Sequence, residues 1–211
     1  PMKNSRKPIP KVCFFSLLFT LFAPFSKGAD WPVWGGDGSR NMVSSETGLV
    51  TDFNPGEMSD DEVVDMKTTK NVKWVAKLGS QAYGNVTVGQ GKVFVGTNNE
   101  SPRDPGKKGD RGVVMCLDEK TGDLLWQLVI PKLGAGKVSD WEYIGVCSSA
   151  AIDGDKVYVV TNRCEVVCLD INGLADGNAG PFKDEAKYVR PKGKQDELNE
   201  KTDADIIWMY D

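Results

Sequence analysis

Histidine is absent from the 211 residues, which removes the commonest general base and metal ligand of proteins. A Ser-His-Asp or Cys-His arrangement is therefore excluded within this chain. Cysteine is scarce, with five residues and no C-x-x-C spacing. Cys164 and Cys168 are four residues apart, roughly 13 Å in an extended strand, which is too far for a disulfide between them. We expect them to be buried small side chains, with a redox pair as the alternative.

The chain also lacks an apolar run of the roughly 20 residues that a membrane-spanning helix needs. Its main apolar run, Val12–Phe25, follows a basic start and precedes Ser26-Lys27-Gly28, whose small residues suit cleavage. This order is typical of a signal peptide, which we expect over residues 1–28, with an uncleaved anchor as the alternative. The sequence therefore predicts a periplasmic or extracellular protein.

Positive charge is in short supply once this segment is removed. Residues 1–28 carry five basic and no acidic side chains, so their removal leaves 21 Lys and Arg against 30 Asp and Glu, a net charge of −9. Such a balance disfavours nucleic acid and anionic membrane surfaces as partners. The expected partner is a protein or a small molecule, and the expected contact with a membrane is through the export signal alone.

The most informative stretch is Cys116–Trp126. Two apolar segments, residues 113–117 and 124–130, flank the sequence Glu-Lys-Thr-Gly, which predicts an antiparallel hairpin whose Gly122 supplies the positive φ of the turn. Asp118 is placed to cap that turn by accepting backbone N–H groups. Trp126 adds a large flat apolar surface with one N–H donor.

The spacing small residue-x-Asp-x-x-Thr-Gly-x-x-x-Trp resembles the tryptophan-docking motif of the pyrroloquinoline-quinone-type β-propellers, with Cys116 where that family usually has Ala. The resemblance implies that one blade is fastened to the next by a set of docking residues. In this chain they are Asp118, Thr121, Gly122 and Trp126. Trp74 and Trp208 occupy the positions equivalent to Trp126 in the neighbouring repeats. The same repeat occurs in quinoprotein dehydrogenases and in propellers that bind no quinone and act as scaffolds.

An internal repeat supports the propeller. Residues 88–98 align without a gap on residues 152–162, and residues 114–118 match residues 166–170. The residue numbers of the two aligned pairs differ by 64 and by 52, so the first repeat has twelve extra residues between its second and third strands. These fall in Asn99–Arg111, for which we expect a solvated loop.

The predicted fold is an all-β partial β-propeller of four-stranded antiparallel blades, about two blades plus a closure strand at residues 71–78. Residues 29–70 form an irregular extension that includes an acidic surface loop over residues 51–69, with at most a short helical turn. The propeller itself takes residues 71–211. Blade one spans about 84–130, and blade two spans about 145–211, with an insertion at residues 171–205 on the outer rim.

Residues 29–70 hold no three strands to pair with the strand at residues 71–78, and the chain stops within the strand at residues 206–210. Two blades do not close a ring. The sequence therefore predicts an N-terminal fragment of a larger propeller.

The segment Trp31-Pro32-Val33-Trp34-Gly35-Gly36 looks like the one that leads into secreted propellers of this type and packs across their blades. We expect the side chains of Trp31 and Trp34 to pack against the protein, with contact to a ligand as the less favoured alternative. The sequence of residues 162–170, followed by residues 172–177, resembles a subgroup of secreted bacterial propellers abundant among planctomycetes.

Two places in the sequence are candidates for a ligand site. Asp170, Asn172 and Asp176 put oxygen ligands in a Gly-containing loop, as Ca²⁺ sites do. A ligand is missing where Leu174 stands, however, and no bidentate Glu follows in register, so a solvated turn is preferred. Trp141 and Glu142, between the blades and near the expected channel mouth, form the polar-aromatic pair to inspect first.

The function that these features favour is an exported scaffold for binding or assembly. The alternative is a pyrroloquinoline-quinone-dependent oxidoreductase of the alcohol or sugar dehydrogenase type. For such an enzyme the resemblance implies pyrroloquinoline quinone and Ca²⁺ as cofactors. No catalytic residue is identified for that alternative, because no reaction-specific cluster of side chains occurs in the sequence.

Overall fold

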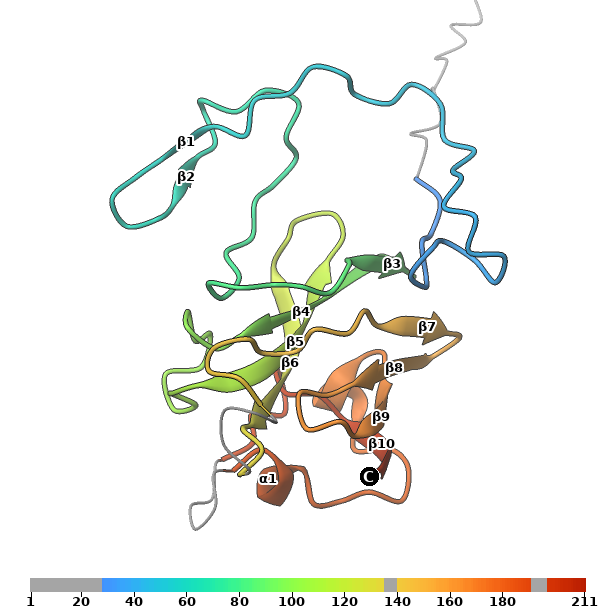
Figure 1. Cartoon of the computed structure of the whole chain (residues 1–211), viewed down its shortest axis with the longest axis vertical. Coiled ribbons are helices and arrows are strands. Elements are labelled where there is room, and N and C mark those ends of the chain that lie inside the picture. The colour runs from blue at the N-terminus through green and yellow to red at the C-terminus, as the bar shows by residue number, and fades with distance from the viewer. Residues whose placement is uncertain (1–27, 135–139, 191–196) are drawn as a thin grey trace, which may run out of the picture.

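The computed structural model describes residues 28–134, 140–190 and 197–211, so the expected signal peptide falls outside the described residues except for Gly28. The chain is all-β, as predicted (Figure 1). Two short helices, η1 (Gly173–Asp176) and α1 (Glu185–Tyr188), lie between the last two strands of the described part. No helix in these ranges is long and apolar enough to cross a membrane. The strands are β1 (Glu57–Met58), β2 (Val64–Asp65), β3 (Thr87–Gly89), β4 (Lys92–Asn98), β5 (Arg111–Asp118), β6 (Leu124–Pro131), β7 (Ala151–Asp153), β8 (Lys156–Val160), β9 (Val166–Asp170) and β10 (Ile206–Tyr210).

Blade one is the antiparallel sheet β3-β4-β5-β6, in which each strand pairs with its neighbour in sequence. The β3–β4 turn has positive φ at both central residues, +53° at Gln90 and +76° at Gly91, as a two-residue hairpin turn matched to the strand twist requires. Phe94, Cys116 and Trp126 lie side by side across β4, β5 and β6. The predicted hairpin is thus β5–β6.

Blade two, β7-β8-β9-β10, repeats this plan. Tyr158, Cys168 and Trp208 occupy the positions that Phe94, Cys116 and Trp126 hold in blade one. The aromatic pairs repeat as well, with ring centroids 5.8 Å apart for Phe94 and Trp126 and 6.0 Å apart for Tyr158 and Trp208.

The main core lies between the two blades. One face of blade one packs against one face of blade two, and β3 approaches β7 so closely that a Cβ on Gly89 would meet Ile152 Cδ1 at 2.9 Å. Burial of apolar side chains from both sheets holds the blades face to face. Its almost fully buried side chains include Phe94, Trp126, Leu128, Ile130, Val157, Leu169 and Ile206.

The second face of blade one is covered by the segment at residues 71–78, the expected closure strand. These residues alternate in burial but are assigned no strand in the described structure. Trp74, Ala76 and Leu78 pack onto the buried cluster formed by Val93, Met115 and neighbouring apolar residues. The segment thus contacts blade one through side chains on the face of the sheet.

The N-terminal extension contacts both blades at its beginning. Trp31 exchanges backbone hydrogen bonds with Val88 of β3, and the carbonyl of Pro32 accepts the N–H of Ile152 in β7 at 2.8 Å. Trp34, expected to pack, is instead 48% exposed, because the chain turns away at Gly35 and Gly36.

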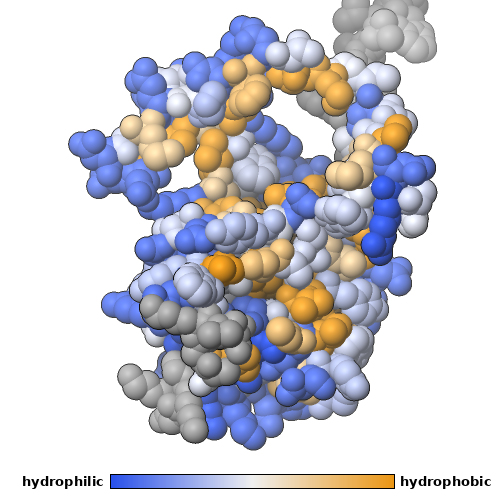
Figure 2. Space-filling view, in the orientation of Figure 1, coloured by the Kyte–Doolittle hydropathy of each residue, from blue (hydrophilic) through white to orange (hydrophobic). Residues whose placement is uncertain are grey.

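Farther along, the extension forms a small hairpin, β1–β2, in place of the expected helical turn. Figure 2 shows orange, apolar side chains on the arch that leads to this hairpin, above the blades. Besides Trp34, the exposed large apolar residues of the extension are Met42, Val43, Leu49, Val50, Phe53, Met58, Val63 and Met66.

The loop at residues 99–111 is not simply solvated, contrary to expectation. Lys107 is only 2% exposed, and its Nζ donates to Asp203 Oδ1 at 2.6 Å. Asp203 belongs to the long insertion of blade two, so a buried ion pair joins the extra segments of both blades. A charge so deeply buried needs such a partner, which is why this loop turns inward.

The rest of the insertion is fastened to blade one at two more places. The backbones of Thr202 and Ala204 exchange hydrogen bonds with Gln127 of β6, so the insertion borders the edge strand of blade one. Near α1, the Val189 carbonyl accepts a hydrogen bond from Arg111 Nη1 at 3.0 Å. These contacts give an irregular segment a fixed path.

Candidate functional site

The predicted docking residues lie in two equivalent contacts. Trp126 is buried, and its indole N–H donates to the carbonyl of Ile171 at 2.9 Å; Trp74 does the same to Glu119 at 3.0 Å, across the same separation of 45 residues. Each ring packs flat on a glycine with positive φ. A Cβ on Gly173 would meet the Trp126 ring at 2.8 Å, and one on Gly122 would meet the Trp74 ring at 2.5 Å.

The turn beneath each ring is shaped by an aspartate. Asp118 Oδ1 accepts the N–H groups of Thr121 at 2.9 Å and Lys120 at 2.8 Å, and these hydrogen bonds lower the pKa of the Asp118 carboxyl. In blade two, Asp170 Oδ1 accepts the N–H of Asn172 at 2.8 Å. The acceptor half of the contact is therefore present in blade two, although its sequence departs from the motif after Asp170.

Trp208 occupies the matching position in β10 but is 39% exposed, and its ring lies over Tyr158. The contacts of Trp74 and Trp126 are structural, joining segments without presenting polar atoms to a ligand. That all three tryptophans and their turns act as docking elements is a prediction about stability.

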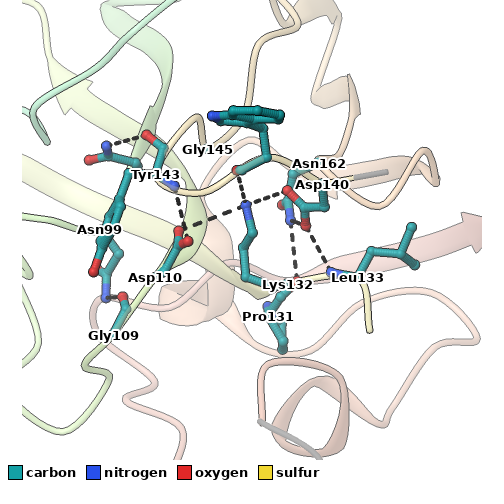
Figure 3. Close-up of polar contacts among 12 residues, drawn as sticks. Asn99, Gly109, Asp110, Pro131, Lys132, Leu133, Asp140, Tyr143, Gly145 and Asn162 are labelled. Atoms are coloured by element: carbon teal, nitrogen blue, oxygen red, sulfur yellow. Dashed lines mark hydrogen bonds and ion pairs between the residues drawn. The ribbon is translucent and has the colours of Figure 1, made fainter. Parts of the chain in front are cut away.

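A different set of residues builds a surface site at the connection between the blades (Figure 3). Lys132, which directly follows β6, places its Nζ between two carboxylates, in ion pairs with Asp140 and, at 3.8 Å, Asp110. Its Nζ also donates to the carbonyl of Trp141 at 2.5 Å. The Lys132 ammonium group thus links the end of β6 to the loop before β5 and to the connection into blade two.

Asp140 is buried and is held on its other oxygen. Its Oδ2 accepts the N–H of Leu133 at 2.8 Å and the side-chain N–H of Asn162 at 2.9 Å. Asn162 also donates to the Pro131 carbonyl at 3.3 Å, and its amide lies directly against Gly112, where a Cβ would clash. The carboxylate is therefore fixed by three donors from two segments, Lys132 and Leu133 after β6 and Asn162 after β8.

The loop that this network supports is a β-turn over residues 141–144, closed by a hydrogen bond from Ile144 N to Trp141 O at 3.4 Å. Tyr143 has a φ of +57°, an uncommon conformation for a bulky residue. Both of its backbone groups are held: Asp110 Oδ2 accepts its N–H at 3.0 Å, and Asn98 Nδ2 donates to its carbonyl at 2.5 Å.

The side chains of this turn are left in solvent. Trp141 is 60% exposed and Tyr143 is 44% exposed, and Glu142 is exposed between them. A rigid backbone therefore presents two aromatic rings outward. The sequence indicates Trp141 and Glu142 but not the residues that hold the turn. Asn98 and Asn162 were visible as equivalent positions of the repeat, whereas Asp110, Lys132 and Asp140 stand in segments without a pattern.

The candidate Ca²⁺ loop forms a capped turn. Asp170 Oδ1 accepts the backbone N–H of Asn172, and the Asn172 side chain donates to Asp176 Oδ2 at 2.9 Å. The amide thus turns its N–H, not its oxygen, toward Asp176. Within the described ranges, no group of three or more His, Cys, Asp and Glu side chains has the geometry of a metal site.

Cys168 is buried as expected, whereas Cys164 is exposed, so the expectation for it is wrong; Cys116 is buried as well. Cys164 follows β8 in a turn and has a φ of +66°, which directs the chain outward between β8 and β9. Cys147 is also exposed. All four of these described cysteines are free thiols.

Two blades with equivalent aromatic positions and equivalent indole contacts define a β-propeller built from tryptophan-docked repeats. Residues 30–178 match the PQQ_2 family model, which is described as outer membrane protein assembly factor BamB. The chain therefore belongs to this family of PQQ-like β-propeller repeats. No protein in a curated collection matches the chain.

The quinone for which the repeat is named does not fit the residues described. Quinoproteins of this kind hold it together with Ca²⁺, and the described side chains offer no three-ligand group for that ion. Histidine is also absent from the sequence. We therefore derive no step through the cofactor.

Proposed function

We propose that the protein is an exported scaffold that binds a protein partner through the turn at residues 141–144. The proposal is supported by the family's description as an assembly factor and by one observation in particular. Trp141 and Tyr143 are exposed on a backbone that Lys132, Asp110 and Asn98 hold in place.

Exposed aromatic side chains on a preorganised backbone are what a binding hot spot requires. Tryptophan and tyrosine dominate hot spots because they bury a large area with few rotatable bonds. A turn already fixed in its bound shape does not lose backbone entropy on association. The unusual φ of Tyr143 supports the same reading, since such conformations cluster at ligand-binding sites.

Export is the second part of the proposal. It rests on the basic start, the apolar run and the small residues within positions 1–28, and it places the partner in the periplasm or outside the cell. Fractionation of cells that express the whole protein should recover it outside the cytoplasm, shortened by about these residues. Recovery of the full-length chain in the cytoplasm would contradict this part.

The test of the binding site uses the whole protein carrying an affinity tag. The variant Trp141→Ala/Tyr143→Ala should lose a defined envelope protein that co-purifies with the wild type. The control Trp34→Ala removes an exposed tryptophan from the N-terminal segment and should retain that partner. Equal recovery from all three proteins would rule out the turn as the binding site.

The oxidoreductase alternative makes an opposite prediction. It expects that added pyrroloquinoline quinone and Ca²⁺ give a bound quinone absorbance and reduction of a dye by alcohols or sugars, whereas the scaffold proposal expects neither. If both appear, the protein is an enzyme and the scaffold proposal is wrong.

A further inference from the structure

A pocket of about 570 Å³ lies between α1, the turn after β8 and the end of β6, and its size is that of cavities that hold small molecules. Figure 1 shows α1 beside the end of β6. The charged side chains that line the pocket, among the described residues, are four cations and one carboxylate: Lys132, Arg163, Lys187 and Arg190, with Asp184. Basic side chains therefore dominate this pocket, although the whole chain has a net charge of −4.

Arg163 and Tyr188 are held in this pocket by one buried carboxylate. Glu165, just before β9, is 2% exposed, and its Oε1 pairs with Arg163 Nε at 3.1 Å. Its Oε2 accepts the hydroxyl of Tyr188 at 2.6 Å and that of Thr161 at 3.0 Å. The guanidinium carbon of Arg163 lies 5.8 Å from the centroid of the Tyr188 ring. Both side chains are therefore fixed before a ligand arrives, so binding does not have to order them.

Several N–H donors of these cations have no acceptor in the described part of the chain. The two terminal nitrogens of Arg163 make no hydrogen bond there, and the Arg190 guanidinium makes neither a hydrogen bond nor an ion pair with a described residue. Lys187 Nζ is 3.7 Å from Asp184 Oδ2, but the two side chains are 67% and 69% exposed, and such surface pairs contribute little. Two guanidinium groups and one ammonium group can therefore donate to an anionic ligand.

The pocket also has an apolar wall. Phe182 and Tyr188 pack edge to face, with ring centroids 6.3 Å apart and an angle of 87° between the rings, and Met209 of β10 lines the pocket beside them. The Tyr188 hydroxyl is engaged by Glu165, so its ring contributes apolar surface. A guanidinium group matches the two oxygens of a carboxylate, whereas an inorganic anion would leave the rings without a contact.

We propose that this pocket binds a small organic anion in which a carboxylate is joined to an apolar ring. Arg163 and Arg190 bind the carboxylate, and the two aromatic side chains contact the ring. Lys132 borders both this pocket and the partner-binding turn at residues 141–144, but its ammonium group is already paired with Asp140. The proposal does not use Lys132 or the turn, so either proposal can fail alone.

The test is a ligand-observed NMR titration of the whole protein with three probes: 1-naphthylacetate, its neutral amide 1-naphthylacetamide, and inorganic phosphate. The acid should bind saturably with a dissociation constant on the order of 1 mM, as expected for a ligand of its size. The amide should bind about tenfold more weakly, because charge-assisted hydrogen bonds are stronger than neutral ones. Phosphate should also bind more weakly than the acid, because it has no apolar part.

Arg190→Gln is the variant to use, because Arg163→Gln would leave the Glu165 carboxylate buried without its cation. It should weaken binding of the acid about tenfold, to the level of the amide, and leave binding of the amide unchanged. The matched control is Arg40→Gln, which removes an exposed arginine from the N-terminal extension and should bind the acid as the wild type does.

Three results would overturn the proposal. Equal binding of the acid and the amide by the wild type would show that the pocket does not recognise the charge. Phosphate bound as tightly as the acid, or the same loss in Arg40→Gln as in Arg190→Gln, would mean that the anion is attracted by surface charge in general. Absence of saturable binding of the acid to the wild type would equally contradict it, and this titration needs no variant to fold.

Discussion

Trp126 of blade one and Ile171 of blade two are joined by a hydrogen bond of 2.9 Å from the indole N–H to the backbone carbonyl. Trp74 and Glu119 make the same bond one repeat earlier. In both cases the ring rests on a glycine in a left-handed conformation, where any larger residue would push it away. The sequence repeat therefore reproduces the same tryptophan contact in each repeat, and this contact fixes each segment onto the next.

Replacing Trp126 by Ala should lower the free energy of unfolding by about 3–5 kcal/mol, because a large buried side chain is removed from the core between the blades. Trp126→Phe keeps most of the ring but loses the hydrogen bond to Ile171, and should cost less. Denaturant unfolding of the whole protein measures both, with Trp34→Ala as the exposed control. A wild-type unfolding midpoint for Trp126→Ala would show that the indole does not dock the blades.

Asp118 should make stability depend on pH. Its pKa is lowered in the folded protein by the N–H groups of Thr121 and Lys120, so its contribution is present above the unfolded pKa and is lost as pH falls through the folded one. Asp118→Asn should therefore be less stable than the wild type above about pH 4, with the difference shrinking at lower pH. A difference that is the same at pH 3 and pH 7 would contradict this role.

The Lys107–Asp203 ion pair gives a prediction about the insertions. Lys107→Met leaves the Asp203 carboxylate buried without its cation and should cost about 3–5 kcal/mol. The double variant Lys107→Met/Asp203→Leu removes both charges and should recover part of that loss. Chemical denaturation of the single and double variants tests the pair, and additive losses would mean that the two residues do not interact.

Cysteine reactivity separates the buried from the exposed thiols. Burial raises the pKa of the Cys116 thiol to about 12, and Cys168 is likewise buried with a raised pKa. Alkylation of the native protein at pH 8 should modify the exposed Cys147 and Cys164 and leave the other two intact. Mass spectrometry of the digested protein reads this out. Rapid modification of Cys116 would mean that β5 is not enclosed by its neighbours.

The fold was predictable where its determinants lie close together in sequence. Asp118, Gly122 and Trp126 fall within one hairpin, and the gapless repeat of residues 88–98 identified the second blade. The path of the insertion was not predictable, because Lys107 and Asp203 are separated by 96 residues and Gln127 pairs with a segment that has no strand pattern.

The candidate site shows the same division. Trp141 stood out in the sequence as an aromatic residue in a connecting loop. The side chains that hold its turn come from the end of β4, the loop before β5 and the end of β6. Nothing local in the sequence links Asn98, Asp110 and Lys132, since they meet only after the sheet has formed.

The most direct test of the proposed function is site-specific photo-crosslinking in living cells, with a photoreactive amino acid placed at position 141 and, as the control, at position 34. The proposal predicts that position 141 captures one defined envelope protein and that position 34 does not. The captured band should weaken when Lys132→Met removes the cation that holds the turn. The same protein captured at both positions, or no capture at position 141, would contradict a binding site at this turn.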